Sequence, residues 1–259
     1  MKKFLSLGLV LLLSIGLLAG CSGGSQKSEK SDTTAKVYKI ATDTTFAPFE
    51  FQNEAGEYVG IDIEILKAVA EDQGFKYKLD PLGFNAAVAA LESNQADGVI
   101  AGMSITKERQ KKYDFSAPYY DSGVVMAVSA NNDTIKSYKD LAGKKVAVKT
   151  GTEGATFAES IKGTYGFEVV YFDESPMMYE DVKTGNSVAC FEDYPVMGFG
   201  ITQGNGLKMV TDMEKGSSYG FAVLKGKNTE LLKMFDAGLK NIKENGKYQE
   251  IIDKYISAE

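Results

Sequence analysis

The stretch Ala101-Gly102-Met103-Ser104-Ile105-Thr106-Lys107-Glu108-Arg109-Gln110 follows an apolar run, 98–101, that is typical of a buried strand. Arg109 is the only arginine among 29 basic residues. We expect a short polar helix to begin here, and strand ends and helix N-termini leave backbone N–H groups free to meet an anion. An arginine side chain binds a carboxylate through two parallel hydrogen bonds, which a lysine cannot do. The stretch therefore predicts a carboxylate site at the end of a strand.

Outside this stretch, short β-rich runs alternate with helical stretches. This pattern predicts an α/β fold with mostly parallel sheets flanked by helices. The expected strands are 37–42, 75–79, 98–101, 124–129, 145–149, 168–172, 187–191 and 219–224. The expected helices are 61–73, 85–91, 155–161, 177–184 and two amphipathic helices between 229 and 256.

Two of the expected strands, 124–129 and 219–224, are candidates for crossings between two lobes. Gly123 precedes the first and Gly220 lies near the start of the second, and glycine tolerates the backbone rotation that a crossing must absorb. Paired crossings form a two-strand hinge. We therefore expect lobe 1 to comprise residues 37–122 and 220–259, and lobe 2 to comprise residues 123–219.

The N-terminus carries the pattern of an export signal. Lys2 and Lys3 precede an apolar run, 4–19, that is short for a membrane span. The following Leu17-Leu18-Ala19-Gly20-Cys21 resembles a bacterial lipobox. That resemblance implies a signal peptide over 1–20, lipidation of Cys21 and a location on the extracytoplasmic face of the cell membrane, with the lipid as the sole membrane contact. Residues 21–36, polar after the cysteine, are expected to form a disordered tether.

Composition excludes several classes of function. The net charge is −6, and without Lys2 and Lys3 it becomes −8 (27 basic minus 35 acidic residues), which argues against a nucleic-acid partner. The chain has no histidine, which removes Ser-His-Asp and Cys-His catalysis and histidine metal sites. We expect no metal and no cofactor. Cys190 lies in an apolar run and is predicted to be buried packing.

Four segments share one arrangement, a strand end followed by polar or aromatic residues and then a helix or turn. They are 43–49, 101–109, 149–152 and 191–195. In open α/β sheets, ligands bind outside the carboxyl ends of the strands. Together the segments offer an arginine for a carboxylate, an aspartate for an ammonium and aromatic faces for an apolar stem, which suits a free α-amino acid. The Gly-rich turn at 150–154 lacks the Gly-Lys-Ser/Thr ending of a nucleotide-binding loop, so we reject ATP.

These motifs resemble a known family. Ala41-Thr42-Asp43-Thr44-Thr45-Phe46-Ala47-Pro48-Phe49-Glu50-Phe51, Ala101 to Arg109, Asp114-Phe115-Ser116-Ala117-Pro118-Tyr119-Tyr120 and Val146-Ala147-Val148-Lys149-Thr150-Gly151-Thr152 are similar to signatures of the polar-amino-acid class of bacterial extracellular solute-binding proteins. The resemblance covers residues 37–257. It implies a two-lobed protein, expected to be a monomer, that closes on one free L-amino acid and delivers it to the permease subunits of an ABC transporter.

The resemblance also implies roles for individual residues. Arg109 and Ser104 would bind the α-carboxylate, and the Gly102 carbonyl and Asp193 the α-ammonium. Further candidates in the matching motifs are Phe46 and Phe84 around the side-chain stem, Asp43 and Lys149 at the side-chain amide of glutamine-binding members, and Ala101 and Thr152.

Two positions depart from the glutamine-binding pattern. Glu192 stands where those members often have histidine, and Glu153 where they have glycine. Both add negative charge that we expect near the side-chain pocket. If Lys149 pairs with one of them, a neutral amide still fits; if it does not, a cationic ligand becomes plausible.

The leading hypothesis is thus a lipid-anchored receptor for a polar amino acid, glutamine first. Lysine, arginine and glutamate are alternatives within the binding class. An enzyme on the same scaffold, or a sensor that reports to a membrane receptor, is a rival from another class, because fold does not fix function. The chain offers little for catalysis, and we expect no enzyme.

Overall fold

The computed structural model describes residues 36–256. The predicted signal peptide, the lipidation site Cys21 and nearly all of the predicted tether lie outside these residues. None of the helices between residues 36 and 256 combines the length and the hydropathy that a membrane span requires.

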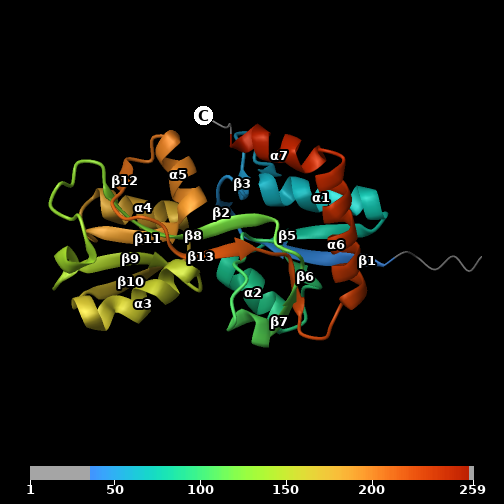
Figure 1. Ribbon diagram of the computed structural model, residues 1–259, viewed down its shortest axis with the longest axis horizontal. Helices are drawn as coiled ribbons and strands as arrows, with labels where there is room; N and C mark the ends of the chain where they lie inside the picture. The colour runs from blue at the N-terminus through green and yellow to red at the C-terminus, as the bar shows by residue number, and fades with distance from the viewer. Residues whose placement is uncertain (1–35, 257–259) are drawn as a thin grey trace, which may run out of the picture. The chain divides into compact units, whose positions relative to one another are not determined.

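Two main sheets organise these residues, and each is flanked by helices (Figure 1). The five-stranded sheet has the order β5-β1-β6-β14-β7 and comprises β1 (Val37–Thr42), β5 (Lys76–Pro81), β6 (Gly98–Val99), β7 (Tyr113–Phe115) and β14 (Ala222–Leu224). The six-stranded sheet has the order β10-β9-β11-β8-β12, with β13 also paired to β8. Its strands are β8 (Tyr120–Ser129), β9 (Lys145–Lys149), β10 (Glu168–Phe172), β11 (Ala189–Asp193), β12 (Leu207–Met209) and β13 (Glu214–Tyr219).

One strand in each sheet runs against the others. In the five-stranded sheet β14 pairs antiparallel with both β6 and β7, while β5, β1 and β6 are parallel. In the six-stranded sheet β8 pairs antiparallel with β11, β12 and β13, while β10, β9 and β11 are parallel. The sheets are therefore mostly parallel in strand direction, as predicted.

Helices cover both faces of each sheet. Around the five-stranded sheet lie α1 (Ile61–Gln73), α2 (Phe84–Glu92), α6 (Thr229–Glu244) and α7 (Lys247–Tyr255), together with a small sheet of β2 (Thr45–Phe46), β3 (Glu50–Gln52) and β4 (Tyr58–Val59). Around the six-stranded sheet lie α3 (Glu153–Tyr165), α4 (Ser175–Lys183) and α5 (Tyr194–Thr202). Two 3-10 turns, η1 (Arg109–Lys111) and η2 (Tyr138–Leu141), complete the elements. We call the first group lobe 1 and the second lobe 2.

Alternation along the strands builds the core of lobe 2. On β11, Ala189 and Phe191 pack toward α3 with Phe157, whereas Cys190 packs toward α4 with Met178. Successive side chains of a strand point to opposite faces, so one apolar run fills two layers. Cys190 is fully buried, which confirms its predicted packing role.

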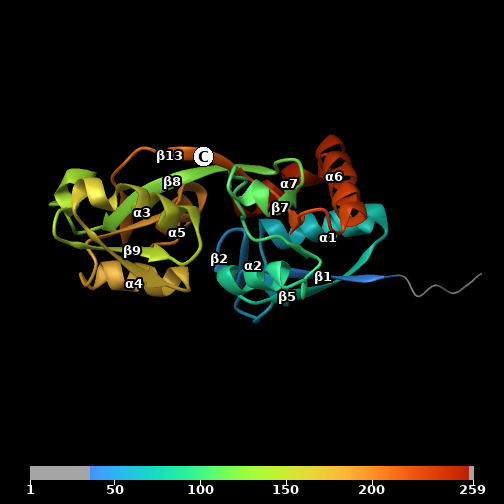
Figure 2. The same cartoon turned by 90° about the horizontal axis from the view of Figure 1, so that it is seen from below.

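The chain passes between the two sheets twice, from β7 to β8 and from β13 to β14. β8 and β13 run side by side as an antiparallel pair, with Tyr120 opposite Tyr219 and Ser122 opposite Ser217 (Figure 2). The predicted single strand 219–224 is wrong, because β13 ends at Tyr219 and β14 begins at Ala222 in the other sheet. The predicted boundaries 122/123 and 219/220 lie in or beside this pair, and they stay a prediction.

Candidate functional site

The predicted site residues gather where strands of both lobes end. Asp43 directly follows β1 and Ala101 follows β6 in lobe 1, while Lys149 ends β9 and Asp193 ends β11 in lobe 2. The carboxyl ends of parallel strands meet at one edge of a sheet, so each lobe presents its polar residues on one side.

Most of these residues line one narrow pocket. It is lined by ten of the twelve residues expected from the sequence, namely Asp43, Phe46, Phe84, Ala101, Gly102, Ser104, Arg109, Thr152, Glu153 and Asp193. The remaining two, Lys149 and Glu192, are buried beside it, at 1% and 2% exposure.

The side chain of Arg109, which extends from lobe 1, is held in place by two backbone carbonyls. Its guanidinium donates to Ser104 O at 3.0 Å and, across to lobe 2, to Gly151 O at 3.0 Å. It also stacks over the Phe84 ring, 5.4 Å from the centroid. The expected polar helix is only the three-residue turn η1, so the positive charge here comes from the side chain rather than from a helix end. With two of its five N–H donors bonded to carbonyls, the guanidinium keeps donors for a ligand carboxylate.

Gly102 forms a tight turn after β6. Its φ is +50°, and a Cβ there would lie 2.3 Å from the Phe46 ring, so a larger residue would displace that ring. Its N–H donates to Asp62 Oδ2 at 2.7 Å, a bond that fixes the direction of the turn. Tyr119 donates to the same oxygen at 2.8 Å.

Asp193 is, with Glu153, one of two acidic residues of lobe 2 that line the pocket. Burial, together with the negative charge of the neighbouring Glu192 carboxylate, raises the pKa of Asp193 to about 7. Tyr219, at the end of β13, donates to Asp193 Oδ2 at 2.6 Å and accepts from Ser122 at 3.0 Å. The crossing strands thus bond a residue that lines the pocket.

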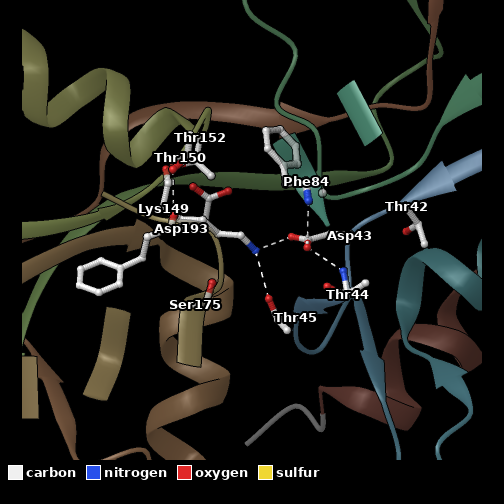
Figure 3. Close-up of polar contacts among 12 residues, drawn as sticks. Thr42, Asp43, Thr44, Thr45, Phe84, Lys149, Thr150, Thr152, Ser175 and Asp193 are labelled. Carbon is white, nitrogen blue, oxygen red and sulfur yellow. Dashed lines mark hydrogen bonds and ion pairs between the residues drawn. The ribbon is translucent and has the colours of Figure 1, made fainter. Parts of the chain in front are cut away.

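Lys149 and Asp43 form an ion pair between the lobes at the inner end of the pocket (Figure 3). Lys149 Nζ lies 2.5 Å from Asp43 Oδ2, and each side chain is 1% exposed. Asp43 also accepts from the backbone N–H of Thr44 at 2.6 Å and of Phe84 at 3.1 Å. Thr45 accepts from Lys149 at 3.4 Å.

The two glutamates that depart from the glutamine-binding pattern lie at different places around the pocket. Glu153, at the start of α3, lies 3.9 Å from the Arg109 guanidinium, so its charge faces the other end of the pocket. Glu192 faces α4, where it accepts from Ser175 at 3.0 Å and Tyr179 at 2.9 Å. The expectation of added charge near the side-chain pocket is therefore wrong for Glu153, whereas Glu192 does lie next to Lys149, with its carboxylate bonded to α4. Lys149 is bonded to neither, because its partner is Asp43, so the condition stated above for a cationic ligand is met and that ligand class stays open beside glutamine.

Four functional candidates escaped sequence reasoning: Asp62, Glu50, Tyr219 and Tyr179. Burial raises the pKa of Asp62 to about 6, and burial together with Asp62 raises the pKa of Glu50 well above its usual range. Glu50 and Asp62 both lie in or near the motifs quoted above, each among apolar neighbours. An acidic residue in an apolar run is the signal that could have found them. Within residues 36–256, no group of three or more acidic or cysteine side chains is arranged to hold a metal ion.

Comparison with known proteins assigns the family. The profile of the bacterial extracellular solute-binding proteins, family 3, matches residues 38–258. This chain belongs to that family. It is 30% identical over 260 residues to the arginine-binding extracellular protein ArtP of Bacillus subtilis (strain 168), and the match covers 100% of both chains. It is an amino-acid-binding extracellular solute-binding protein of ABC transporters.

Solved structures agree on the fold. An ancestral arginine-binding protein bound to arginine superposes with a TM-score of 0.80 at 37% identity, over 85% of this chain and 98% of that one. The second substrate-binding domain of Lactococcus lactis GlnP, in an open conformation, is 42% identical over 87% of this chain and 97% of its own, yet its TM-score is 0.61. The chain thus matches the arginine-bound structure more closely than the open one, which accords with the polar contacts that join its two lobes.

Proposed function

We propose that this protein binds L-glutamine between its lobes and delivers it to an ABC permease. The α-carboxylate lies against Arg109 and Ser104, and the α-ammonium against Asp193 and the Gly102 carbonyl. Phe46 and Phe84 pack against the aliphatic stem. The side-chain amide meets Lys149 and Asp43.

The Lys149–Asp43 pair carries this proposal. A carboxamide has one acceptor and two donors, so its oxygen can accept from the ammonium of Lys149 while its nitrogen donates to Asp43. The pair has no net charge, and a neutral side chain leaves that balance intact. A guanidinium at the same place would instead bring a second buried cation next to Lys149, which costs free energy in a site of low dielectric.

Arginine is the second candidate, because relatives described as arginine-binding stand beside one described as glutamine-binding. The Bacillus subtilis relative and the ancestral protein are both described as arginine-binding. Arginine would need a carboxylate beyond Asp43 at the inner end, and Glu192 is the group next to Lys149 that could supply one.

We also propose that the protein acts without catalysis and as a monomer, anchored by lipid at Cys21, with the hinge boundaries at 122/123 and 219/220. The strand pair β8–β13 supports the hinge, and the lipobox-like sequence supports the anchor. Mass spectrometry of membrane-extracted protein should detect the diacylglyceryl group. In Cys21→Ala we expect the protein to lose its association with the membrane.

A thermal-shift panel of the twenty amino acids tests the ligand, after carried-over ligand has been removed by unfolding and refolding. A ligand at about 100 times its dissociation constant adds about 2.7 kcal/mol of stability. For a domain of this size the midpoint then rises by roughly 5–10 °C. Norvaline, which lacks the amide, is the matched control and should give a much smaller shift. A shift with arginine and none with glutamine would contradict the proposal.

A further inference from the structure

Glu192 and Lys149 are neighbours at the ends of adjacent parallel strands. Phe191 of β11 lies opposite Val148 of β9, so the next residue of each strand, Glu192 and Lys149, lies side by side. Both fall on the face of the sheet that packs against α4, because Cys190 and Ala147, two residues earlier, pack there with Met178. A carboxylate in this position is well placed to act on the inner end of the pocket.

The Glu192 carboxylate is nevertheless turned to α4. Its Oε2 accepts from the hydroxyls of Ser175 and Tyr179, at 3.0 Å and 2.9 Å, and its Oε1 accepts from the Asp193 N–H at 2.9 Å. Ser175 and Tyr179 lie four residues apart in α4 and so share one face of the helix. Ser175 is the first residue of that helix, where the helix dipole favours a negative charge.

These three bonds keep the Glu192 carboxylate out of direct contact with Lys149, whose charge partly offsets the rise in the Glu192 pKa that burial causes. Lys149 and Asp43 alone sum to zero, which suits a carboxamide. A Glu192 carboxylate free to turn toward Lys149 would bring its negative charge into direct contact with the inner end of the pocket. It would then meet a cationic side chain directly, or draw Lys149 away and leave Asp43 to meet it.

We propose that Ser175 and Tyr179 determine specificity, because they hold the Glu192 carboxylate against α4 and keep the inner end of the pocket selective for a neutral carboxamide over a cationic side chain. This inference rests on the proposed function. It makes Ser175 and Tyr179 positioning residues that act on the ligand through Glu192.

The test is the ratio of dissociation constants for arginine and glutamine, measured by calorimetry. In Ser175→Ala/Tyr179→Phe we expect this ratio to fall about tenfold or more relative to wild type, since discrimination is a difference of two affinities. Adding Glu192→Gln to the double variant removes the released charge, and the ratio should return to within about twofold of wild type. A loss of packing alone would not be rescued by that third substitution.

Tyr171→Phe is the matched control. Its hydroxyl donates to Glu159 at 2.7 Å in the same lobe but on the surface, and its removal should leave the ratio unchanged. If the double variant unfolds, Tyr179→Phe alone keeps the ring and should shift the ratio in the same direction by about threefold.

Two failures are distinguishable. A wild-type protein that does not bind glutamine overturns the proposed function. A glutamine-binding protein whose ratio is unchanged in the folded double variant, or in Tyr179→Phe where that is the variant that folds, overturns only the specificity role of these two hydroxyls.

Discussion

At the scale of single residues, the expected role of Arg109 in binding depends on the planar geometry of its guanidinium as well as on its charge. The guanidinium bonds Ser104 O and Gly151 O, so its plane is fixed by both lobes. A lysine ammonium is a point charge and cannot reproduce this fork.

We therefore expect Arg109→Lys to lose roughly 2–4 kcal/mol of binding free energy, measured by calorimetry with glutamine. Glutamine α-amide, which has no α-carboxylate, is the control ligand and should bind wild type and variant with similar weakness. Unchanged glutamine affinity in the variant would refute the carboxylate role.

Asp193 should make binding depend on pH. An α-ammonium binds the ionised carboxylate, and the pKa of Asp193 is raised to about 7 by burial and by Glu192. Binding then releases a proton below that pH, so the affinity should fall by about tenfold per pH unit as the pH decreases below 7.

Calorimetry from pH 5 to pH 8 measures this slope, with Asp193→Asn as the variant that should bind more weakly and lose the slope. The ligand-free protein should show the opposite trend in stability. A carboxyl whose pKa is raised by folding lowers the stability as the pH rises from about 4 toward 7. A flat affinity profile across this range would argue against Asp193 as the ammonium partner.

At the scale of elements, several predictions hold to the residue. The helix 61–73 ends at Gly74, which adopts φ +70°, and the strands 37–42, 145–149 and 168–172 have the expected bounds. In these segments the spacing of the apolar residues and the residue that ends the element indicate the same bounds. The helix 194–202 was missed because Tyr194-Pro195 resembles the start of a loop, while proline is well tolerated in the first turn of a helix.

The turn at Gly102 gives a sharp test of how an element shapes the pocket. Gly102→Ala faces both a positive φ and a Cβ contact of 2.3 Å with Phe46. We expect it to cost roughly 2–4 kcal/mol of stability and to weaken glutamine binding, measured by urea unfolding and calorimetry.

Gly74→Ala separates the two causes. Gly74 also has a positive φ, but nothing lies within 4 Å of its added Cβ. This control should cost about 1 kcal/mol and leave the affinity unchanged. Equal effects of both substitutions would mean that Phe46 is not pressed against the turn.

At the scale of the whole molecule, the sequence predicted which residues meet but not how they pair. Ten of the twelve expected residues line one pocket, because motifs at strand ends converge whenever the sheets form. The sequence could not show that Lys149 would bond Asp43 and that Glu192 would turn to Tyr179. The Lys149–Asp43 pair joins segments more than a hundred residues apart, and the Tyr179–Glu192 bond joins a strand to the helix before it. Both pairings depend on how these segments pack in three dimensions.

The Lys149–Asp43 pair should bias the ligand-free protein toward closure. Lys149→Met leaves Asp43 without its counter-charge, and breaking a buried pair in this way costs about 3–5 kcal/mol in the closed form. The lobes should then open, which small-angle X-ray scattering would record as a larger radius of gyration without ligand.

Asp43→Asn/Lys149→Met should recover part of the closed population, since no unpaired charge is left. Lys208→Met is the control, because its pair with Asp133 is exposed and lies within lobe 2. An unchanged radius in Lys149→Met would show that other contacts hold the lobes together.

The burial of Cys190 has a practical consequence. It is the only cysteine after Cys21, its side chain is inaccessible, and burial raises the pKa of its thiol well above the usual range. Maleimide reagents attack exposed thiolates, so a chain that starts after Cys21 should stay unlabelled in its native state. New cysteines at the exposed positions Leu82 in lobe 1 and Met177 in lobe 2 would then be the only reactive thiols. A donor and an acceptor dye attached there would turn the native chain into an optical reporter of amino acids, with no need to remove a cysteine first.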